Sequence, residues 1–242
     1  MKSCDKEKIL EKAQKWFLST IAENHIRNTE KLSNPDAFNI NPFLATYLAN
    51  FLEGDSSPIS IAKALIFPRV LGSSITTSFG TNMQKFSSEV LDSFGSTTQG
   101  IDIEFIDQLD GHKKYCQLKA GPNTINRDDV ETIHNHFDSI VRLARTNNLR
   151  IANDDLIIGV FYGTHNELSG HYLRLESQYN HPIFVGKDFW LHLTGDSNFY
   201  RDLISSIMHV AEKANGMKII EETIEELASS DVIINLSKSI TS

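Results

Sequence analysis

The amino-acid sequence predicts an α/β fold with a small central sheet between helices. Two stretches with apolar residues at helical spacing, 80–94 and 127–146, enclose a hairpin signal at 101–119. A near-continuous run of apolar β-formers, 156–162, comes next and is typical of a strand covered on both faces. The order helix, hairpin, helix, buried strand therefore indicates a core with helices on both sides of the sheet.

The size and composition of the chain favour one folded protein. It has 242 residues, of which 40% are hydrophobic, and this is enough for one substantial domain. We expect a helical N-terminal region at 1–72 that packs on a core at 73–242 with C-terminal helices, the two forming one compact domain overall.

The sequence favours a cytoplasmic setting. No apolar run approaches the roughly 20 residues that span a membrane. The charged N-terminus lacks the apolar stretch of a signal peptide. The only cysteines are Cys4, in that charged terminus, and Cys116, on the expected buried face of the hairpin, so no disulfide between them is expected.

The region before the hairpin is predicted to be mainly helical. Its expected elements are a helix at 5–31, a loop through Asn34-Pro35 and Asn41-Pro42, short helices at 43–53 and 59–66, a Ser/Thr-rich loop at 73–78 and a helix at 80–94. The helix at 59–66 should end before Pro68, because the residue that precedes a proline avoids helical geometry.

The region after the hairpin alternates between helices and strands. Residues 127–146 predict a strong amphipathic helix, with Asn126 as its cap and with Asp128 and Asp129 in its first turn. The remaining expected elements are the strand at 156–162, a polar loop at 163–181, a strand at 183–185 and helices at 187–194, 198–214 and 217–229.

The hairpin carries an unusual set of polar residues. Asp110-Gly111 is a strong signal for a two-residue type I′ turn, which needs positive φ at both positions. With that turn, Asp102 faces Lys119 and Glu104 faces Gln117, and all four side chains share one face of the hairpin. Such a cluster suits a divalent cation beside a phosphate. The alternative is a half-exposed hairpin whose polar pairs only satisfy its solvent face.

The residues around this cluster resemble a known family. They are Gly-Ile-Asp102-Ile and, after a short spacer, Gln117-Leu-Lys119-Ala-Gly-Pro-Asn-Thr-Ile-Asn126. This pattern resembles the PD-(D/E)XK nuclease superfamily and, within it, the PmeII-like type II restriction endonucleases. Matching segments extend the resemblance from about residue 39 to residue 190; they are Asn39–Phe43, Phe67–Gly72, Ile158–Gly163 and Val185–Trp190.

The resemblance implies the restriction-endonuclease-like core, a central mixed sheet flanked by helices, with helical additions at both ends. It also implies a type II restriction endonuclease that hydrolyses double-stranded DNA at a short (pseudo)palindromic site with Mg²⁺. Asp102 and Gln117, or the Leu118 carbonyl, would ligate Mg²⁺, and Lys119 would orient the attacking water. The expected enzyme is a homodimer in the cytoplasm of a prokaryote, partnered by a DNA methyltransferase that protects the same site.

Gln117 departs from the superfamily pattern. The superfamily usually has Asp or Glu at this place, and Gln resembles the variant of Mrr-like nucleases. An amide oxygen is a weaker ligand for a hard cation than a carboxylate. The missing charge is expected from Glu104 on the same face or from Glu89 on the preceding helix. Gln117 also leaves open a catalytically inactive DNA-binding protein and a modification-dependent nuclease.

Two segments are candidates for DNA contact. The first follows the Lys119 strand and can hold a phosphate near a helix N-terminus; its residues are Asn123, Thr124, Asn126 and Arg127. The second is the polar loop 163–181, where Arg174 can pair with guanine and Asn166, Gln178 or Asn180 with adenine. The net charge of −8 argues mildly against a nucleic-acid partner but permits a local basic surface.

The run His134-Asn135-His136 superficially resembles a His-Asn-His nuclease signature. Consecutive helical residues point about 100° apart, so these side chains cannot converge on one metal ion. The two histidines are therefore predicted to be surface or interface residues.

Overall fold

The computed structural model describes residues 3–148 and 150–241. By their contacts these residues form two compact units that interleave along the sequence. The first unit comprises the chain up to Trp16 and residues 79–207, and the second unit comprises 17–78 and the residues from 208 onward. The N-terminal region expected at 1–72 thus contributes to both units.

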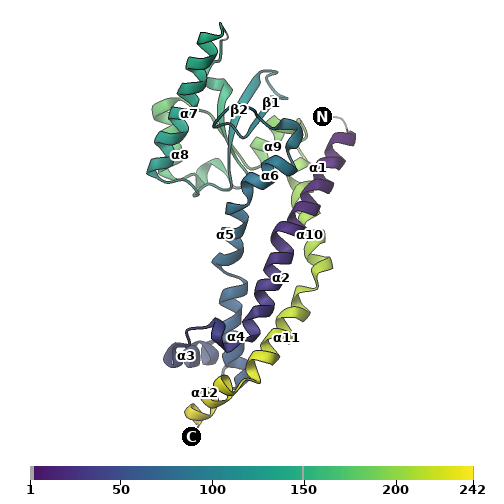
Figure 1. Ribbon diagram of the computed structural model, residues 1–242, viewed down its shortest axis with the longest axis vertical. Helices are drawn as coiled ribbons and strands as arrows, with labels where there is room; N and C mark the ends of the chain where they lie inside the picture. Colours follow the sequence, from purple (N-terminus) through teal and green to yellow (C-terminus); the bar gives the residue numbers. More distant parts are fainter. Residues whose placement is uncertain (1–2, 149, 242) are drawn as a thin grey trace. The chain divides into compact units, whose positions relative to one another are not determined.

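The first unit is built on a mixed four-stranded sheet (Figure 1). Its strands, in spatial order, are β1 (Ile103–Ile106), β2 (Lys113–Lys119), β3 (Leu156–Val160) and β4 (Ile183–Val185). The β1 and β2 strands are antiparallel, whereas β2, β3 and β4 run parallel. Every residue of β3 is buried, as its continuous apolar sequence predicted. The predicted α/β fold with a central mixed sheet is confirmed.

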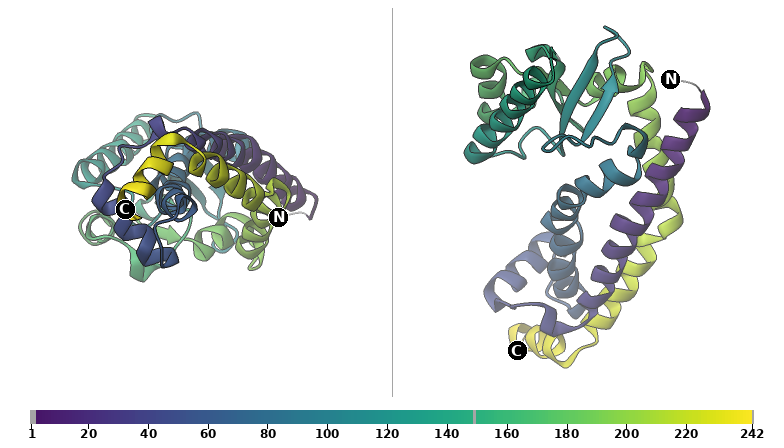
Figure 2. Two further views of the ribbon diagram at one scale, coloured as in Figure 1. Left: turned by 90° about the horizontal axis from the view of Figure 1, so that it is seen from below. Right: turned by 45° about the horizontal axis from the view of Figure 1, so that its top comes forward.

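Helices cover both faces of this sheet (Figures 1 and 2). On one face lie α7 (Arg127–Thr146) and α8 (Gly170–Tyr179), which share a core cluster with β3 and β4. On the other face lie α6 (Met83–Glu89) and α9 (Lys187–Thr194), joined by edge-to-face contacts of Phe86 and Trp190 with Phe161. The first unit also contains α1 (Ser3–Trp16), most of α10 (Phe199–Ala214) and the short helices Asp92–Phe94, Asn153–Asp155 and His165–Glu167.

The second unit is helical and is centred on α4 (Pro58–Val70). Ile61, Ile66 and Val70 of α4 are buried in its core, together with Leu227 of α11. The elements of this unit are a π-helical segment Phe17–Ala22, α2 (Glu23–Glu30), the short helices Lys31–Ser33 and Pro35–Ala37, α3 (Pro42–Glu53), α4, most of α5 (Ser73–Thr81), the end of α10, α11 (Gly216–Ala228) and α12 (Asp231–Thr241). The helix predicted at 5–31 is therefore real but contains a π-helical segment.

The hairpin forms as predicted, but the predicted turn type and strand register are wrong. Gly111 has a positive φ of 75°, whereas Asp110 is not among the described residues with positive φ, so the turn is not type I′. Residues 107–112 form a longer loop instead. The buried Asp107 anchors it, accepting hydrogen bonds from the Leu109 N–H at 2.9 Å and from His192 at 2.7 Å. The pairing shifts by two residues, which keeps each side chain on its predicted face.

Several helix boundaries also differ from the prediction. Residues 73–78, predicted as a loop, begin α5; serine and threonine have only a weak intrinsic preference against the helix, which tertiary context can override. The α4 helix continues through Pro68 to Val70, which is buried in the core. The predicted loop 163–181 contains α8, whose Tyr172 and Leu175 are three residues apart and are buried against the sheet.

The α4 and α5 helices together form a stretch, residues 58–81, that is long and apolar enough to span a membrane by length and composition alone. The prediction missed this stretch because it considered only uninterrupted apolar runs, and polar residues interrupt this one. The core helix of a soluble protein passes the same test, and α4 buries Ile61 and Ile66 within the second unit, so this stretch is weak evidence for a membrane span.

Candidate active site

Asp102 lies directly before β1 and contacts the neighbouring strand. Its Oδ2 accepts a hydrogen bond from the backbone N–H of Leu118 at 2.7 Å. Burial raises the pKa of the Asp102 carboxyl above its ordinary value, although the Leu118 N–H and the nearby side chains of Lys119 and His136 oppose this rise. Asp102 is therefore a partly desolvated carboxylate with the cationic side chain of Lys119 close by, and a further cation would stabilise its charge.

Gln117 lies on β2, on the face that α7 covers. Continuing the observed register by one residue places it opposite Asp102, whereas Glu104 lies opposite Tyr115. The predicted pairs Asp102 with Lys119 and Glu104 with Gln117 are therefore wrong. Gln117 is only 5% exposed, and its Nε2 lies 3.2 Å from Nδ1 of His136 on α7.

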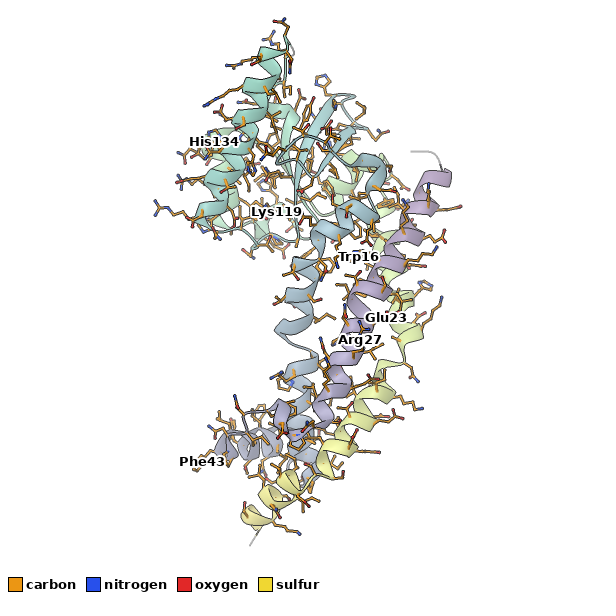
Figure 3. The ribbon with its side chains drawn as sticks, viewed as in Figure 1. Trp16, Glu23, Arg27, Phe43, Lys119 and His134 are labelled. Atoms are coloured by element: carbon orange, nitrogen blue, oxygen red, sulfur yellow. The ribbon has the colours of Figure 1, made fainter. Side chains whose placement is uncertain are left out.

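Lys119 is the last residue of β2 and is half-buried (Figure 3). Alternation along the strand puts it on the same face as Gln117. Its positive charge is close enough to Asp102 to lower the pKa of that carboxyl against the effect of burial. The structure thus brings Asp102, Gln117 and Lys119 together at the end of two neighbouring strands.

The two candidates for a second carboxylate have different surroundings. Glu104 accepts hydrogen bonds from Ser96 and Thr98 and pairs with Lys113 at 2.6 Å. Burial acts to raise the pKa of Glu104, but these three partners together hold it below its ordinary value. Glu89 is the last residue of α6 and is exposed. Within the part of the chain that the structure describes, neither carboxylate makes a hydrogen bond or ion pair with Asp102, Gln117 or Lys119.

The donor set fits a hydrated hard cation better than zinc. Within the described residues, no three or more His, Cys, Asp and Glu side chains gather as a metal site. The Leu118 carbonyl points to the same side of β2 as the Leu118 N–H, which is the side of Asp102. A carboxylate, a backbone carbonyl and the Gln117 amide are all oxygen ligands, and Mg²⁺ typically keeps several waters besides one or two carboxylates.

The segment after β2 forms a hydrogen-bonded turn into α7. Asn126 caps this helix, accepting hydrogen bonds from the backbone N–H groups of Asp128 and Asp129 in a capping box. Thr124 Oγ1 donates to the Gly121 carbonyl at 2.9 Å and lies 3.2 Å from the Tyr172 hydroxyl. The predicted cap is confirmed. The side chains of Thr124 and Asn126 thus hold the turn, while Asn123 and Arg127 are exposed.

The two residues predicted to read bases lie on helices rather than in an open loop. Asn166 is exposed in the short helix His165–Glu167. Arg174 is on α8, where its Nε donates to Gln178 at 2.7 Å.

His136 is the functional candidate that sequence reasoning missed. It was predicted to be a surface or interface residue, and in the structure it is half-buried and contacts Gln117. His134 stacks instead on Tyr179, with ring centroids 4.0 Å apart (Figure 3 labels His134). The signal was present in the helical periodicity. His136 comes three residues after Ile133 and four before Ile140, both buried, so it borders the inward stripe of α7.

The mixed sheet between two layers of helices is consistent with the core of restriction-endonuclease-like proteins. The sequence matches the family of the type II restriction endonuclease EcoO109I over residues 11–215, and the chain belongs to this family. No curated protein matches the chain. The family consists of endodeoxyribonucleases of restriction systems, and membership implies DNA binding.

Proposed function

We propose that this protein is a Mg²⁺-dependent type II restriction endonuclease of the PD-(D/E)XK superfamily, similar to PmeII-like enzymes, with a Gln-x-Lys variant of the motif. It would cut both strands at a short (pseudo)palindromic DNA site. The observation that carries the proposal is the junction of β1 and β2, where Asp102 is bonded to the N–H of Leu118 between Gln117 and Lys119.

Each residue of the cluster has a proposed role. Asp102, the Leu118 carbonyl and the Gln117 amide oxygen hold the cation. When bound, Mg²⁺ polarises the scissile phosphate and acidifies a coordinated water. Lys119 orients the attacking water and stabilises the charge that develops on the phosphate.

The second carboxylate is proposed to be Glu104 or Glu89. Glu104 is on the same face of the hairpin, but Lys113 already neutralises much of its charge. Glu89 is exposed at the end of α6, a helix that contacts β2. Glu104 shares the face of Gln117, whereas α6 packs on the other face of the sheet, so Glu89 would have to reach the cation around the edge of the sheet.

The DNA backbone is proposed to contact the turn from Gly121 to α7. Asn123 and Arg127 are exposed there, and their side chains can donate hydrogen bonds to phosphate oxygens. Thr124 and Asn126 would hold this turn in shape through the hydrogen bonds described above. Arg174 and Asn166 are proposed to reach base edges in the major groove.

We also propose that the enzyme is a homodimer, because cutting both strands of a symmetric site requires two active sites. The α3 helix buries only Ala45 and Ala49 and exposes large apolar residues, which are Phe43, Leu44, Tyr47, Leu48, Phe51 and Leu52. Figure 3 shows Phe43 projecting outward from this helix. An exposed apolar face of this kind is typical of an interface, and we assign it to a second copy of the chain. The enzyme would act in the cytoplasm of a prokaryote beside a DNA methyltransferase that protects the same site.

The test is cleavage of plasmid DNA by the purified protein with and without Mg²⁺. We expect discrete fragments with Mg²⁺, none with EDTA, and a loss of at least about 100-fold in Asp102→Ala and Lys119→Ala. Asp154→Ala and Lys187→Ala remove exposed charges of the same types and should cleave normally.

Three outcomes would contradict this proposal. Near-normal turnover in Asp102→Ala or Lys119→Ala would refute the site assignment. Binding of DNA without cleavage by the unmodified protein would indicate an inactive DNA-binding protein. Cleavage of methylated DNA alone would indicate a modification-dependent nuclease.

A further inference from the structure

A glutamine is an ambiguous metal ligand because its two ends differ. A carboxylate offers an oxygen at either end, whereas an amide has one oxygen and one NH₂ group, and only the oxygen ligates a hard cation. A Gln at the position of a catalytic acid therefore needs a neighbour that fixes its orientation. Such a neighbour must supply a hydrogen-bond acceptor that faces the NH₂ group.

His136 has this position. Its Nδ1 lies 3.2 Å from Nε2 of Gln117, and Gln117 is buried with 5% exposure. When the Nδ1 of the neutral ring accepts from the Gln117 NH₂ group, the amide oxygen is turned away from the ring. Continuing the hairpin register one residue beyond its last pair, Ile103 with Cys116, places Asp102 opposite Gln117 on the neighbouring strand.

The ring of His136 is itself held in place from two sides. It belongs to the α7 helix, whose start is fixed by the capping box at Asn126. On the other side it lies against Gly100, which has a φ of 81° and where an added Cβ would come within 2.7 Å of the His136 Cγ. Any other residue at position 100 would meet both a backbone penalty and this clash.

We propose that His136 is a positioning residue that orients Gln117, so that the amide oxygen faces the cation site at Asp102. The inference rests on the proposed metal-dependent function and explains how a Gln-x-Lys site works without the usual acid. Residues that orient a metal ligand typically contribute 10–100-fold to metal affinity. His136 does not touch the substrate, and its effect is transmitted through Gln117.

The experiment is a double-mutant cycle with His136→Phe and Gln117→Glu. The first readout is the binding of Mn²⁺ to the full-length protein without DNA, by calorimetry, and the second is the Mg²⁺ concentration for half-maximal plasmid cleavage. We expect His136→Phe to weaken Mn²⁺ binding about 10-fold or more. In the Gln117→Glu background the same change should cost less than about threefold, because either carboxylate oxygen can ligate.

The matched control is His134→Phe, two residues earlier on α7, where the ring stacks on Tyr179 instead. It should leave Mn²⁺ binding unchanged. If His136→Phe weakens Mn²⁺ binding equally in both backgrounds, His136 has only a packing role and the inference is overturned. The inference is also overturned if His136→Phe weakens Mn²⁺ binding in neither background. If the unmodified protein cuts no DNA while the Mn²⁺ pattern holds, the nuclease proposal fails and the positioning role stands.

Discussion

The two acidic residues of the hairpin are in opposite electrostatic states. Burial raises the pKa of Asp102, whereas Lys113, Ser96 and Thr98 lower that of Glu104 despite its partial burial. A carboxylate that already has a cationic partner gains less from a metal ion than one that is desolvated. Among the residues of this hairpin, Asp102 therefore suits the proposed role of primary metal ligand better than Glu104 does.

A pair of histidines makes stability depend on pH. His181 is 3% exposed, its Nε2 lies 3.3 Å from Nδ1 of His134, and Phe137 packs against its ring. Burial, with a smaller effect from His134, lowers the pKa of His181 to about 4. Below the unfolded pKa of about 6.5 the unfolded chain binds a proton that the folded protein does not, so stability is lost as pH falls from about 6.5 to 4. The loss should reach about 3 kcal/mol at pH 4.

The measurement is the free energy of unfolding in urea between pH 7 and pH 4. His181→Phe keeps a ring in the site but does not titrate, so its stability should fall less steeply over this range than that of the unmodified protein. His112→Gln, at an exposed position, serves as the control and should keep the original slope. Equal slopes for His181→Phe and the unmodified protein would show that His181 is not buried in its neutral form.

At the scale of single residues, the sequence correctly predicted which side chains share a face of the hairpin. Alternation placed Glu104, Gln117 and Lys119 on one face, and a two-residue shift in register could not change that. The partner of Gln117 was missed because His136 comes from another element, 19 residues away, and only the packing of α7 on the sheet brings it there. Contacts between elements depend on how the elements pack against each other. In a single sequence, the signal for such a contact is a polar residue at the border of an apolar stripe.

At the scale of elements, α7 shows why some boundaries were predictable. Its predicted range, 127–146, is the observed range, because a strong apolar stripe and a capping residue agree. The register of the hairpin was missed because Asp107 contacts His192, which is 85 residues away, and so lengthens the turn. The α8 helix was missed because its apolar stripe is short and its other residues are polar.

The cap of α7 should make a measurable contribution to stability. Asn126→Ala removes the side chain that accepts from two backbone N–H groups, and this should lower the free energy of unfolding by about 1 kcal/mol. Asn123→Ala changes an exposed residue of the same turn and should leave it within about 0.5 kcal/mol of the unmodified value. Urea unfolding of the three proteins measures both changes. Equal stability of all three would show that the capping box does not hold the helix start.

At the scale of the whole molecule, the chain forms two units that each contain residues from distant parts of the sequence. Sequence patterns describe local elements, so they did not predict this interleaving. The two units also carry different candidate functional features. The described part of the first unit carries the Asp102, Gln117 and Lys119 cluster, and the second exposes the apolar face of α3.

The apolar face of α3 leads to a prediction about assembly. Phe51 is 79% exposed and stacks with Tyr47, and with Leu48, Leu71 and Pro68 it lines an apolar groove of about 350 Å³. If this face binds a second copy of the chain, Phe51→Glu buries a charge at the interface and should raise the dimer dissociation constant at least 30-fold, which corresponds to about 2 kcal/mol. Sedimentation measures the assembly, and plasmid cleavage should shift from double-strand cuts to single-strand nicks. Leu143→Glu places the same charge at an exposed apolar position on α7 and should leave the dimer intact. A Phe51→Glu protein that remains dimeric at micromolar concentration would exclude this face as the interface, because a buried, unpaired carboxylate is too costly to persist there.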